Sequence, residues 1–536
     1  MNVVITGGPS LLRSALAERL SGAHTVRVAP EGDLRDEAFA REIVEGASAL
    51  VHLAPAYPGL RPGQSGGASD REVLDLATRG SYVLFNAALA AGVQRIVLGS
   101  TLTIMERYPA SWRIGESWQP LPDVNDVSQL AAYLAEEGAK QFARVHPLAI
   151  VGLRFGQIVD DASVEGKPYD SRWLHVDDAV QAVQKALDVP LKLRNYPDGE
   201  APSQGWWVYH VPGGGAHTRV PLSAAANENG LAYAPTHDFA GYAGADDPPP
   251  AASEAERAGD LSIRGPRERT PSRPVRNVVV FGAGGPLAAA TTEELAASYR
   301  LRLTDVRDIA EMAAEGKPQS TGAPLPRVLG EPHETVVVDV TDQEQVLRAC
   351  EGMDAIVNCT VVRPHAVNAF LVNTIGAYNV MRAAVTHGIR RVVHTGPQLV
   401  ANDRPAGYWW DFEVPDDAPG RPGTSLYGFT KYLGQEIVRL FAEQYDLEVP
   451  SLYYSSFVNP RTAKPRQDGV VAMTVSWEDA GRAMRHALEA PSLPSPFEIF
   501  HILADLPHGK FSNAKAKRLL GWQPRDSLVE LWGRRQ

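Results

Sequence analysis

Tyr427 and Lys431, in the stretch Ser425-Leu-Tyr-Gly-Phe-Thr-Lys431, have the residue types and the spacing for acid–base chemistry. The two residues are four apart, so a helix would project both side chains from one face. A phenol ionises at about pH 10 in water, and a neighbouring ammonium group favours the phenolate and lowers that pKa. The pair therefore predicts a tyrosine that acts as acid or base with a lysine as its partner. Because chance supplies such a pair in many chains, its weight depends on the elements that position it.

A glycine-rich turn lies about 145 residues before this pair, in Phe281-Gly-Ala-Gly-Gly-Pro-Leu-Ala288, between an apolar strand and a helical run. Gly282 permits the tight turn, Gly285 lets the backbone approach a pyrophosphate, and the helix N-terminus offers N–H groups to it. Asp305 can accept hydrogen bonds from both ribose hydroxyls and would repel a 2′-phosphate, which favours NAD over NADP. Arg307 weakens that preference. A doubly wound domain with a vestigial nucleotide site is the alternative.

Length and composition bound the class of protein. A chain of 536 residues exceeds what one hydrophobic core usually serves, so two or more domains are expected. A net charge of -11 argues against a nucleic-acid-binding surface. No run of eighteen apolar residues and no signal-peptide pattern is found, so we expect a soluble, cytoplasmic protein without a membrane segment. Cys350 and Cys359 predict neither a disulfide framework nor a metal site.

The chain repeats one plan twice, which predicts tandem duplication. Matching segments follow one another in the same order in both copies: 2–9 and 277–286, 33–36 and 339–342, 45–54 and 351–360, 91–98 and 387–394. The second and third segments begin twelve residues apart in both copies. Short apolar strands alternate with Ala-rich helical stretches, which indicates βαβ units. We predict an α/β protein of two tandem Rossmann-like doubly wound parallel-sheet domains, each with a small C-terminal substrate-side subdomain. The domains span 1–243 and 275–536, and the Pro- and charge-rich segment 244–274 is a linker.

The first copy lacks several of these features. Its turn has Ser10 and Arg13 where small residues belong, and no acidic residue ends its second strand. Tyr133 is followed four residues later by Glu137, and a carboxylate raises the pKa of a phenol rather than lowering it. We therefore expect the first copy to be a degenerate pseudoenzyme domain, although it could still bind a ligand.

These motifs resemble the extended short-chain dehydrogenase/reductase superfamily, in its NAD-dependent epimerase/dehydratase branch, over nearly the whole chain. Further segments carry the resemblance in the second copy: Asp339-Val-Thr-Asp342, Val372-Asn-Thr-Ile-Gly-Ala-Tyr-Asn379 and Leu519-Leu-Gly-Trp-Gln-Pro524. The stretches 475–479, 497–502 and 521–527 are similar to those of uronate dehydrogenases.

The resemblance implies that Tyr427 is the acid/base, that Lys431 holds the nicotinamide ribose, and that a Ser or Thr polarises the substrate. The usual hydroxyl position falls here on Pro397, which has no hydroxyl, so Thr395 and Gln398 are the possible substitutes. An inactive second copy therefore stays an open alternative. The resemblance also implies that the Tyr-bearing helices pair, so that the two copies form a pseudo-dimer within one chain, with a homo-oligomer also possible.

The predicted sites are as follows. The catalytic residues are Tyr427, Lys431 and Thr395; the cofactor NAD is bound by Gly282, Gly285, Asp305, Asp339, Val340, Thr360, Asn373 and Lys431; Arg461 and Gln398 contact the substrate; no metal is expected. His365 and His394 are read as packing or surface residues. The predicted function is NAD(P)-dependent oxidation, reduction or epimerisation of a sugar, a sugar nucleotide or a related small molecule. A catalytically silent nucleotide-binding scaffold and a reductase of a non-sugar metabolite are the alternatives.

Overall fold

Short runs of Val, Ile and Leu form the strands of two parallel sheets in the computed structural model. The model describes residues 1–536 except 8–9, 54–68, 191–204, 216–218, 223, 229, 248–250, 255–273, 319, 321, 398–412, 464–470, 508 and 533–536. The chain divides into two compact units, residues 1–263 (unit 1) and 264–536 (unit 2), each with its own hydrophobic core. The predicted domain limits stay a prediction, since the junction lies outside the described residues.

Unit 1 has a six-stranded, all-parallel sheet in the order β2-β1-β3-β4-β5-β8. Its strands are β1 (Asn2–Thr6), β2 (Thr25–Val28), β3 (Ala49–Leu53), β4 (Arg95–Thr101), β5 (Ala149–Phe155) and β8 (Trp206–Val211). Its helices are α1 (Leu11–Arg19), α2 (Glu37–Val44), α3 (Asp70–Asp75), α4 (Ser81–Ala90), α5 (Val127–Val145), α6 (Asp161–Val164) and α7 (Val176–Asp188).

Unit 2 has a seven-stranded, all-parallel sheet in the order β11-β10-β9-β12-β13-β14-β17. Its strands are β9 (Asn277–Phe281), β10 (Arg300–Asp305), β11 (Glu334–Val337), β12 (Ala355–Asn358), β13 (Arg391–Pro397), β14 (Val449–Tyr454) and β17 (Phe497–His501). Its helices are α9 (Pro286–Leu295), α10 (Ile309–Ala314), α11 (Gln343–Cys350), α12 (Ala366–Phe370), α13 (Gly376–Thr386), α14 (Leu426–Gln444) and α15 (Trp477–Glu489).

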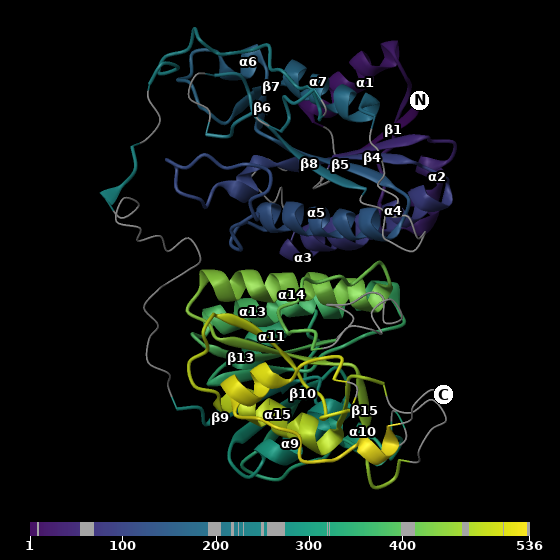
Figure 1. The fold of residues 1–536 in the computed structure, drawn as a ribbon, viewed down its shortest axis with the longest axis vertical. Coiled ribbons are helices and arrows are strands. Elements are labelled where there is room, and N and C mark those ends of the chain that lie inside the picture. Colours follow the sequence, from purple (N-terminus) through teal and green to yellow (C-terminus); the bar gives the residue numbers. More distant parts are fainter. Residues whose placement is uncertain are drawn as a thin grey trace. The chain divides into compact units, whose positions relative to one another are not determined.

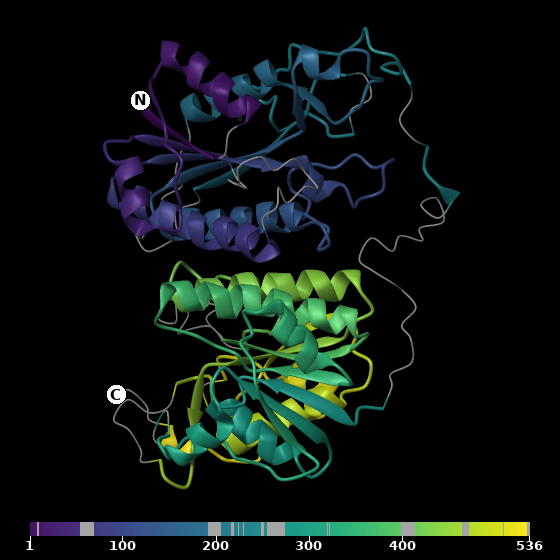
Figure 2. The same ribbon diagram turned by 180° about the vertical axis from the view of Figure 1, so that it is seen from behind.

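Helices cover both faces of each sheet, which explains why the central strands are continuous apolar runs. In unit 1, α1 packs on α7 over one face while α4 and α5 cover the other (Figure 1). In unit 2, α9 packs on α15 over one face, and α11, α13 and α14 cover the opposite face; the view from behind shows the same layers (Figure 2). The predicted fold, two Rossmann-like parallel-sheet domains, is confirmed.

Small paired strands extend each unit beyond its main sheet. They are β6 (Gln157–Val159) with β7 (Trp173–His175) in unit 1, and β15 (Ser456–Val458) with β16 (Thr474–Ser476) in unit 2. Unit 1 has no counterpart of edge strand β11, because the described segment from Val28 runs through only eight residues to Glu37, the start of α2. None of the described helices has the length and apolar character needed to cross a lipid bilayer.

Candidate active site

The glycine turn of unit 2 brings β9 against the end of β12. Gly282 has φ +76°, and a Cβ there would lie 3.0 Å from the carbonyl carbon of Cys359 and from the amide nitrogen of Thr360. Only glycine meets both demands without strain. Gly285 is the N-cap of α9, and Pro286 begins the helix, so the unpaired N–H groups of the first turn face the turn. The turn thus has the shape and the donors of a pyrophosphate site.

Asp305, the last residue of β10, lies against this turn. Its Oδ2 accepts the Gly284 N–H at 3.0 Å and its Oδ1 accepts the Val306 N–H at 2.8 Å. The carboxylate is therefore fixed beside the turn, where it can also accept ribose hydroxyls. Arg307, the residue that weakened the preference for NAD, forms an ion pair with Glu315.

The side wall of the cofactor region is formed by the segment after β11. Val340 is buried, its carbonyl accepts the Asn379 side-chain amide at 3.0 Å, and a Cβ on Gly376 would meet its methyl group at 2.9 Å. Asp339 closes a tight turn by accepting the Thr341 N–H at 2.9 Å. Both residues are thus held by packing and hydrogen bonds rather than left in a free loop.

Asn373 links the loop after β12 to the catalytic helix. It lies in a π-helical turn between α12 and α13, a feature often found at functional sites. Its side chain accepts the Val362 N–H at 3.1 Å and donates to the Val362 carbonyl at 2.8 Å and to Thr430 Oγ1 at 2.9 Å. This buried amide fixes the distance between residues 360–363 and α14.

Tyr427 and Lys431 lie on α14 as the spacing predicted, one turn apart. Lys431 is buried, its Nζ is 3.5 Å from the Thr360 carbonyl oxygen, and burial lowers its pKa to about 8. Tyr427 is partly buried, and burial raises the pKa of its phenol. The charge that opposes this rise belongs to Arg363, whose guanidinium carbon lies 5.0 Å from the centre of the Tyr427 ring.

The remaining candidates, for the catalytic hydroxyl and for substrate binding, are placed less favourably for those roles. Thr395 is buried, and its hydroxyl donates to the Asn358 carbonyl of β12 at 2.9 Å, so it is already engaged. Pro397 ends β13 and, two residues on, lies on the same face of the strand. Arg461 is exposed and pairs with Glu478 at 2.9 Å. Gln398 lies outside the described residues.

His365 and His394 have the surroundings of structural residues rather than of acid–base groups. His365 is the N-cap of α12, and its Nδ1 accepts the Asn368 N–H at 3.3 Å. His394 is fully enclosed in β13, and burial holds its pKa well below the usual range, so the ring is neutral.

Unit 1 differs from the sequence-based expectation at the catalytic helix. α5 and α14 are both 19 residues long and begin after Asp126 and Ser425, respectively. This register places Ser128 and Ala132, not Tyr133 and Glu137, at the positions of Tyr427 and Lys431. The prediction that Tyr133 and Glu137 occupy the positions of the catalytic pair was wrong. It rested on the shared tyrosine, whereas the residue at which the helix begins sets the register. The conclusion that unit 1 lacks the pair is unchanged.

A buried polar network fills the corresponding sheet edge of unit 1. Ser100 Oγ donates to Glu136 at 2.5 Å, Arg154 Nη2 donates to Glu136 at 2.7 Å, and Arg154 Nη1 lies 3.2 Å from His210 Nε2. Burial, with the Arg154 charge, lowers the pKa of His210 to about 3. Its ring is therefore neutral and accepts the hydrogen bond at Nε2.

The matching positions of unit 2 carry neutral side chains. Arg154 pairs across the sheet with Ser100 and His210, and Tyr453 pairs in the same way with Gly396 and His501. The Tyr453 hydroxyl donates to Gln435, at the α14 position that corresponds to Glu136. The correspondence runs across neighbouring strands, so the order of residues along the chain does not reveal it.

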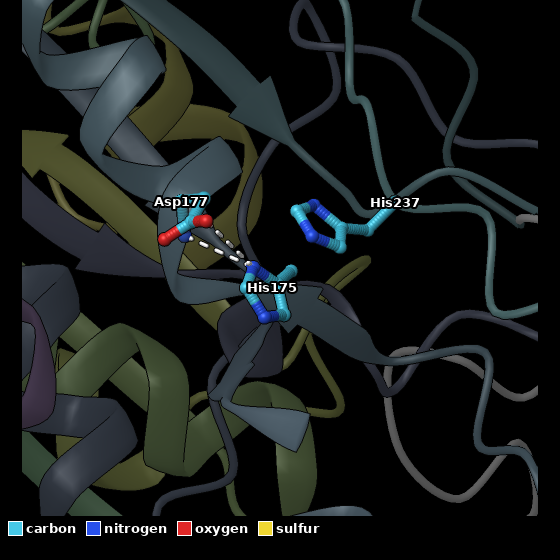
Figure 3. A group of neighbouring side chains, drawn as sticks. All are labelled: His175, Asp177 and His237. Atoms are coloured by element: carbon cyan, nitrogen blue, oxygen red, sulfur yellow. Dashed lines mark hydrogen bonds and ion pairs between the residues drawn. The ribbon is translucent and has the colours of Figure 1, made fainter.

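His175, Asp177 and His237 of unit 1 place their ligand atoms within 4.8 Å of one another, and they are the one such group in the described part of the chain (Figure 3). The two imidazole rings are stacked, with centroids 3.5 Å apart and planes at 18°, so their nitrogen lone pairs do not converge on one point. His175 Nδ1 accepts the Asp177 N–H at 3.2 Å, and Asp177 pairs with Arg19 at 2.5 Å. The cluster caps α7 and does not have the geometry of a metal site.

Unit 2 is similar in sequence to known proteins. Residues 278–491 match the model of the NAD dependent epimerase/dehydratase family. The uronate dehydrogenase of Pseudomonas syringae pv. tomato is 28% identical over 229 residues, which cover 42% of this chain and 74% of that protein. The L-arabinose 1-dehydrogenase (NAD(P)(+)) of Haloferax volcanii is 28% identical over 268 residues, 47% of this chain and 96% of that protein. A solved structure of a mutated uronate dehydrogenase is 26% identical, covers 48% of this chain and 83% of its own chain, and has a TM-score of 0.38.

The predicted resemblance is confirmed for unit 2, and the cofactor that it implied, NAD, is the one that the family's description names. The two relatives named above are a uronate dehydrogenase and an L-arabinose 1-dehydrogenase, and a UDP-glucose 4-epimerase of Mycolicibacterium smegmatis is also similar to this chain. Residues 278–491 form a domain of the NAD dependent epimerase/dehydratase family.

Proposed function

We propose that unit 2 is an NAD-dependent oxidoreductase that oxidises a hydroxyl of a sugar or sugar acid. One observation carries the proposal: the glycine turn and the catalytic pair meet at Thr360. A Cβ on Gly282 would lie 3.0 Å from the Thr360 amide nitrogen, and Lys431 Nζ is 3.5 Å from the Thr360 carbonyl oxygen. A dinucleotide seated on the turn would therefore run toward Lys431 and Tyr427.

The residues of unit 2 have separate tasks in this reaction. Gly282, Gly285 and the N-terminus of α9 would hold the pyrophosphate, and Asp305 the adenosine ribose. Bound NAD would supply the hydride acceptor. The Tyr427 phenolate would take the proton of the substrate hydroxyl, and Lys431 would hold the nicotinamide ribose beside it. Lys431 is buried, so its ammonium group is shielded from bulk water.

The class of substrate rests on the relatives. Their names specify uronates and L-arabinose, so a free sugar or its acid is the first choice over a sugar nucleotide. Loss of the hydroxyl at Pro397 and the engaged Thr395 favour the second candidate, a nucleotide-binding scaffold without turnover. In that case NAD would bind but no sugar would be oxidised.

Unit 1 is proposed to be a pseudo-subunit that arose by duplication of the same plan. Matching cross-strand positions in the two units support this, as does a shared backbone contact: the His210 N–H donates to Glu116, and the His501 N–H donates to Asp416. The Ser100–Glu136–Arg154 network takes the buried positions that Gly396, Gln435 and Tyr453 fill in unit 2. Pairing of the two units within a chain stays a prediction.

Calorimetric titration of the full chain with NAD and with NADP tests the cofactor. Asp305→Asn keeps an oxygen that can accept the Gly284 N–H but loses the charge, so we expect NAD affinity to fall about tenfold or more. Glu344→Gln, a change at an exposed acid of α11, is the matched control and should bind NAD as the wild type does. One NAD per chain is expected; no binding of either nucleotide would overturn the proposal.

A screen of sugars and uronates for NADH formation then tests turnover. Tyr427→Phe keeps the ring but removes the acid–base group, and we expect it to bind NAD while losing activity by about 10²-fold or more. NAD binding without oxidation of any sugar would favour the scaffold.

A further inference from the structure

Arg363 is a cation beside the catalytic tyrosine that the family motifs did not point to. It lies in the loop between β12 and α12, its side chain is exposed, and its guanidinium carbon is 5.0 Å from the Tyr427 ring centre. An arginine over an aromatic face at this distance forms a cation–π contact. Arg363 thus contacts the residue proposed to move the proton.

The loop that carries Arg363 is held in place by its neighbour. Val362 exchanges two hydrogen bonds with the buried side chain of Asn373, which also bonds to Thr430 on α14. Thr430 lies between Tyr427 and Lys431 in sequence. The same amide therefore sets the spacing between the Arg363 loop and the catalytic helix, so the contact with Tyr427 is positioned rather than incidental.

The charged groups around Tyr427 and Lys431 leave the Arg363 guanidinium available to interact with the Tyr427 phenol. No ion pair between Arg363 and a carboxylate is found among the described residues, and its guanidinium lies over the Tyr427 ring. The other titratable groups near the pair are Lys431 on the same helix, Cys359 at the end of β12 and the neutral His394 in β13. Burial raises the pKa of Cys359 to about 12, so this thiol is neutral as well. Among the described residues beside the pair, Arg363 and Lys431 are the cations.

A second cation has a clear use here, because Pro397 removes the usual hydroxyl and Thr395 is bonded to β12. The site has lost one group that stabilises charge on the reacting oxygens. A guanidinium over the phenol makes the phenolate form of Tyr427 more available and thereby offsets part of that loss.

We propose that Arg363 is a positioning residue for the reaction of unit 2, holding the Tyr427 ring and stabilising its phenolate in place of the hydroxyl lost at Pro397. The inference rests on the proposed function for its catalytic meaning. The contact itself can be tested without turnover.

The first experiment titrates the Tyr427 phenol in the full-length protein without cofactor. Tyrosinate ultraviolet absorbance is read in stopped-flow pH jumps, before alkaline unfolding, and the signal of Tyr427 is the difference from Tyr427→Phe in the same background. Arg363→Gln should move the Tyr427 midpoint up by about one pH unit. Arg363→Lys should keep at least part of the wild-type position, and Arg348→Gln, at an exposed arginine of α11, should change nothing.

The second experiment measures kcat/KM for sugar oxidation against pH. Oxidation needs the phenolate, so activity rises with pH through the pKa of Tyr427. Arg363→Gln should shift this rise upward by the same interval, which is about tenfold less activity on the acidic limb and recovery at higher pH. A merely structural loss would instead lower activity equally at all pH values.

The outcomes separate the two proposals. A Tyr427 midpoint that is equal in the wild type and in Arg363→Gln would overturn the role of Arg363, whether or not a substrate is found. A shifted midpoint in a protein that oxidises no sugar would keep the contact and reject the oxidoreductase.

Discussion

Gly282→Ala tests whether the glycine turn is built against β12 as the structure has it. The residue has φ +76°, a region that costs an L-residue about 1–2 kcal/mol. Its new Cβ would also lie 3.0 Å from two main-chain atoms, of Cys359 and Thr360, which are closer than ordinary contacts. The backbone strain and the steric crowding should therefore both lower the free energy of unfolding of Gly282→Ala.

Gly352 offers a matched control in the same unit. It has φ +74°, close to that of Gly282, but nothing lies within 4 Å of the position its Cβ would take. Gly352→Ala should thus cost only the backbone strain, about 1–2 kcal/mol of the free energy of unfolding. Gly282→Ala should cost a further 1–3 kcal/mol or so, because the main chain at Thr360 must move to relieve the overlap.

Denaturant unfolding of the two full-length variants measures the difference, and calorimetry with NAD measures its effect on the site. We expect Gly352→Ala to bind NAD like the wild type and Gly282→Ala to bind it more weakly, since the displaced segment carries the proposed cofactor contacts. Equal losses of stability in the two variants, with NAD binding unchanged in both, would refute the close approach of the turn to β12.

Two further predictions concern buried charges. Asp479→Ala should lower the free energy of unfolding by about 3–5 kcal/mol, because its enclosed carboxylate binds Arg482 and the backbone N–H groups of residues 525 and 526. The control Glu478→Ala, at an exposed carboxylate, should cost under about 1 kcal/mol. Thermal unfolding measures both variants, and equal losses of stability would contradict the prediction. In unit 1, Glu136→Gln or Arg154→Tyr alone should destabilise by roughly 3 kcal/mol or more. The double change, which installs the side chains of unit 2, should recover most of that loss in a double-mutant cycle; additive losses would show that the two networks are not equivalent.

Local patterns account for what the sequence predicted. Runs such as Val278–Phe281 bury both faces of a parallel strand, and Gly282 permits a turn that other residues resist, so the sheets and the turn follow from short-range chemistry. The spacing of Tyr427 and Lys431 needs only a helix to bring the two side chains onto one face. Family motifs then gave the order of the elements and the cofactor.

The same local reasoning failed where register or long-range packing decides. Tyr133 was matched to Tyr427 by type, but the N-cap at Asp126 starts α5 so that Ser128 takes that position. His365 was expected to be a packing or surface residue and is exposed, but its cap on α12 depends on where that helix begins and was not predicted.

By itself, the sequence determined two Rossmann-like units, one intact glycine turn and one tyrosine–lysine pair, because each depends on residues close together in the chain. Tertiary structure alone brought Arg363 over Tyr427, 64 positions away. It also joined Glu136 to Arg154 and His210 across three elements. Such contacts depend on how β-strands, loops and helices pack together, and no periodicity along the chain encodes which charged side chain will face which partner.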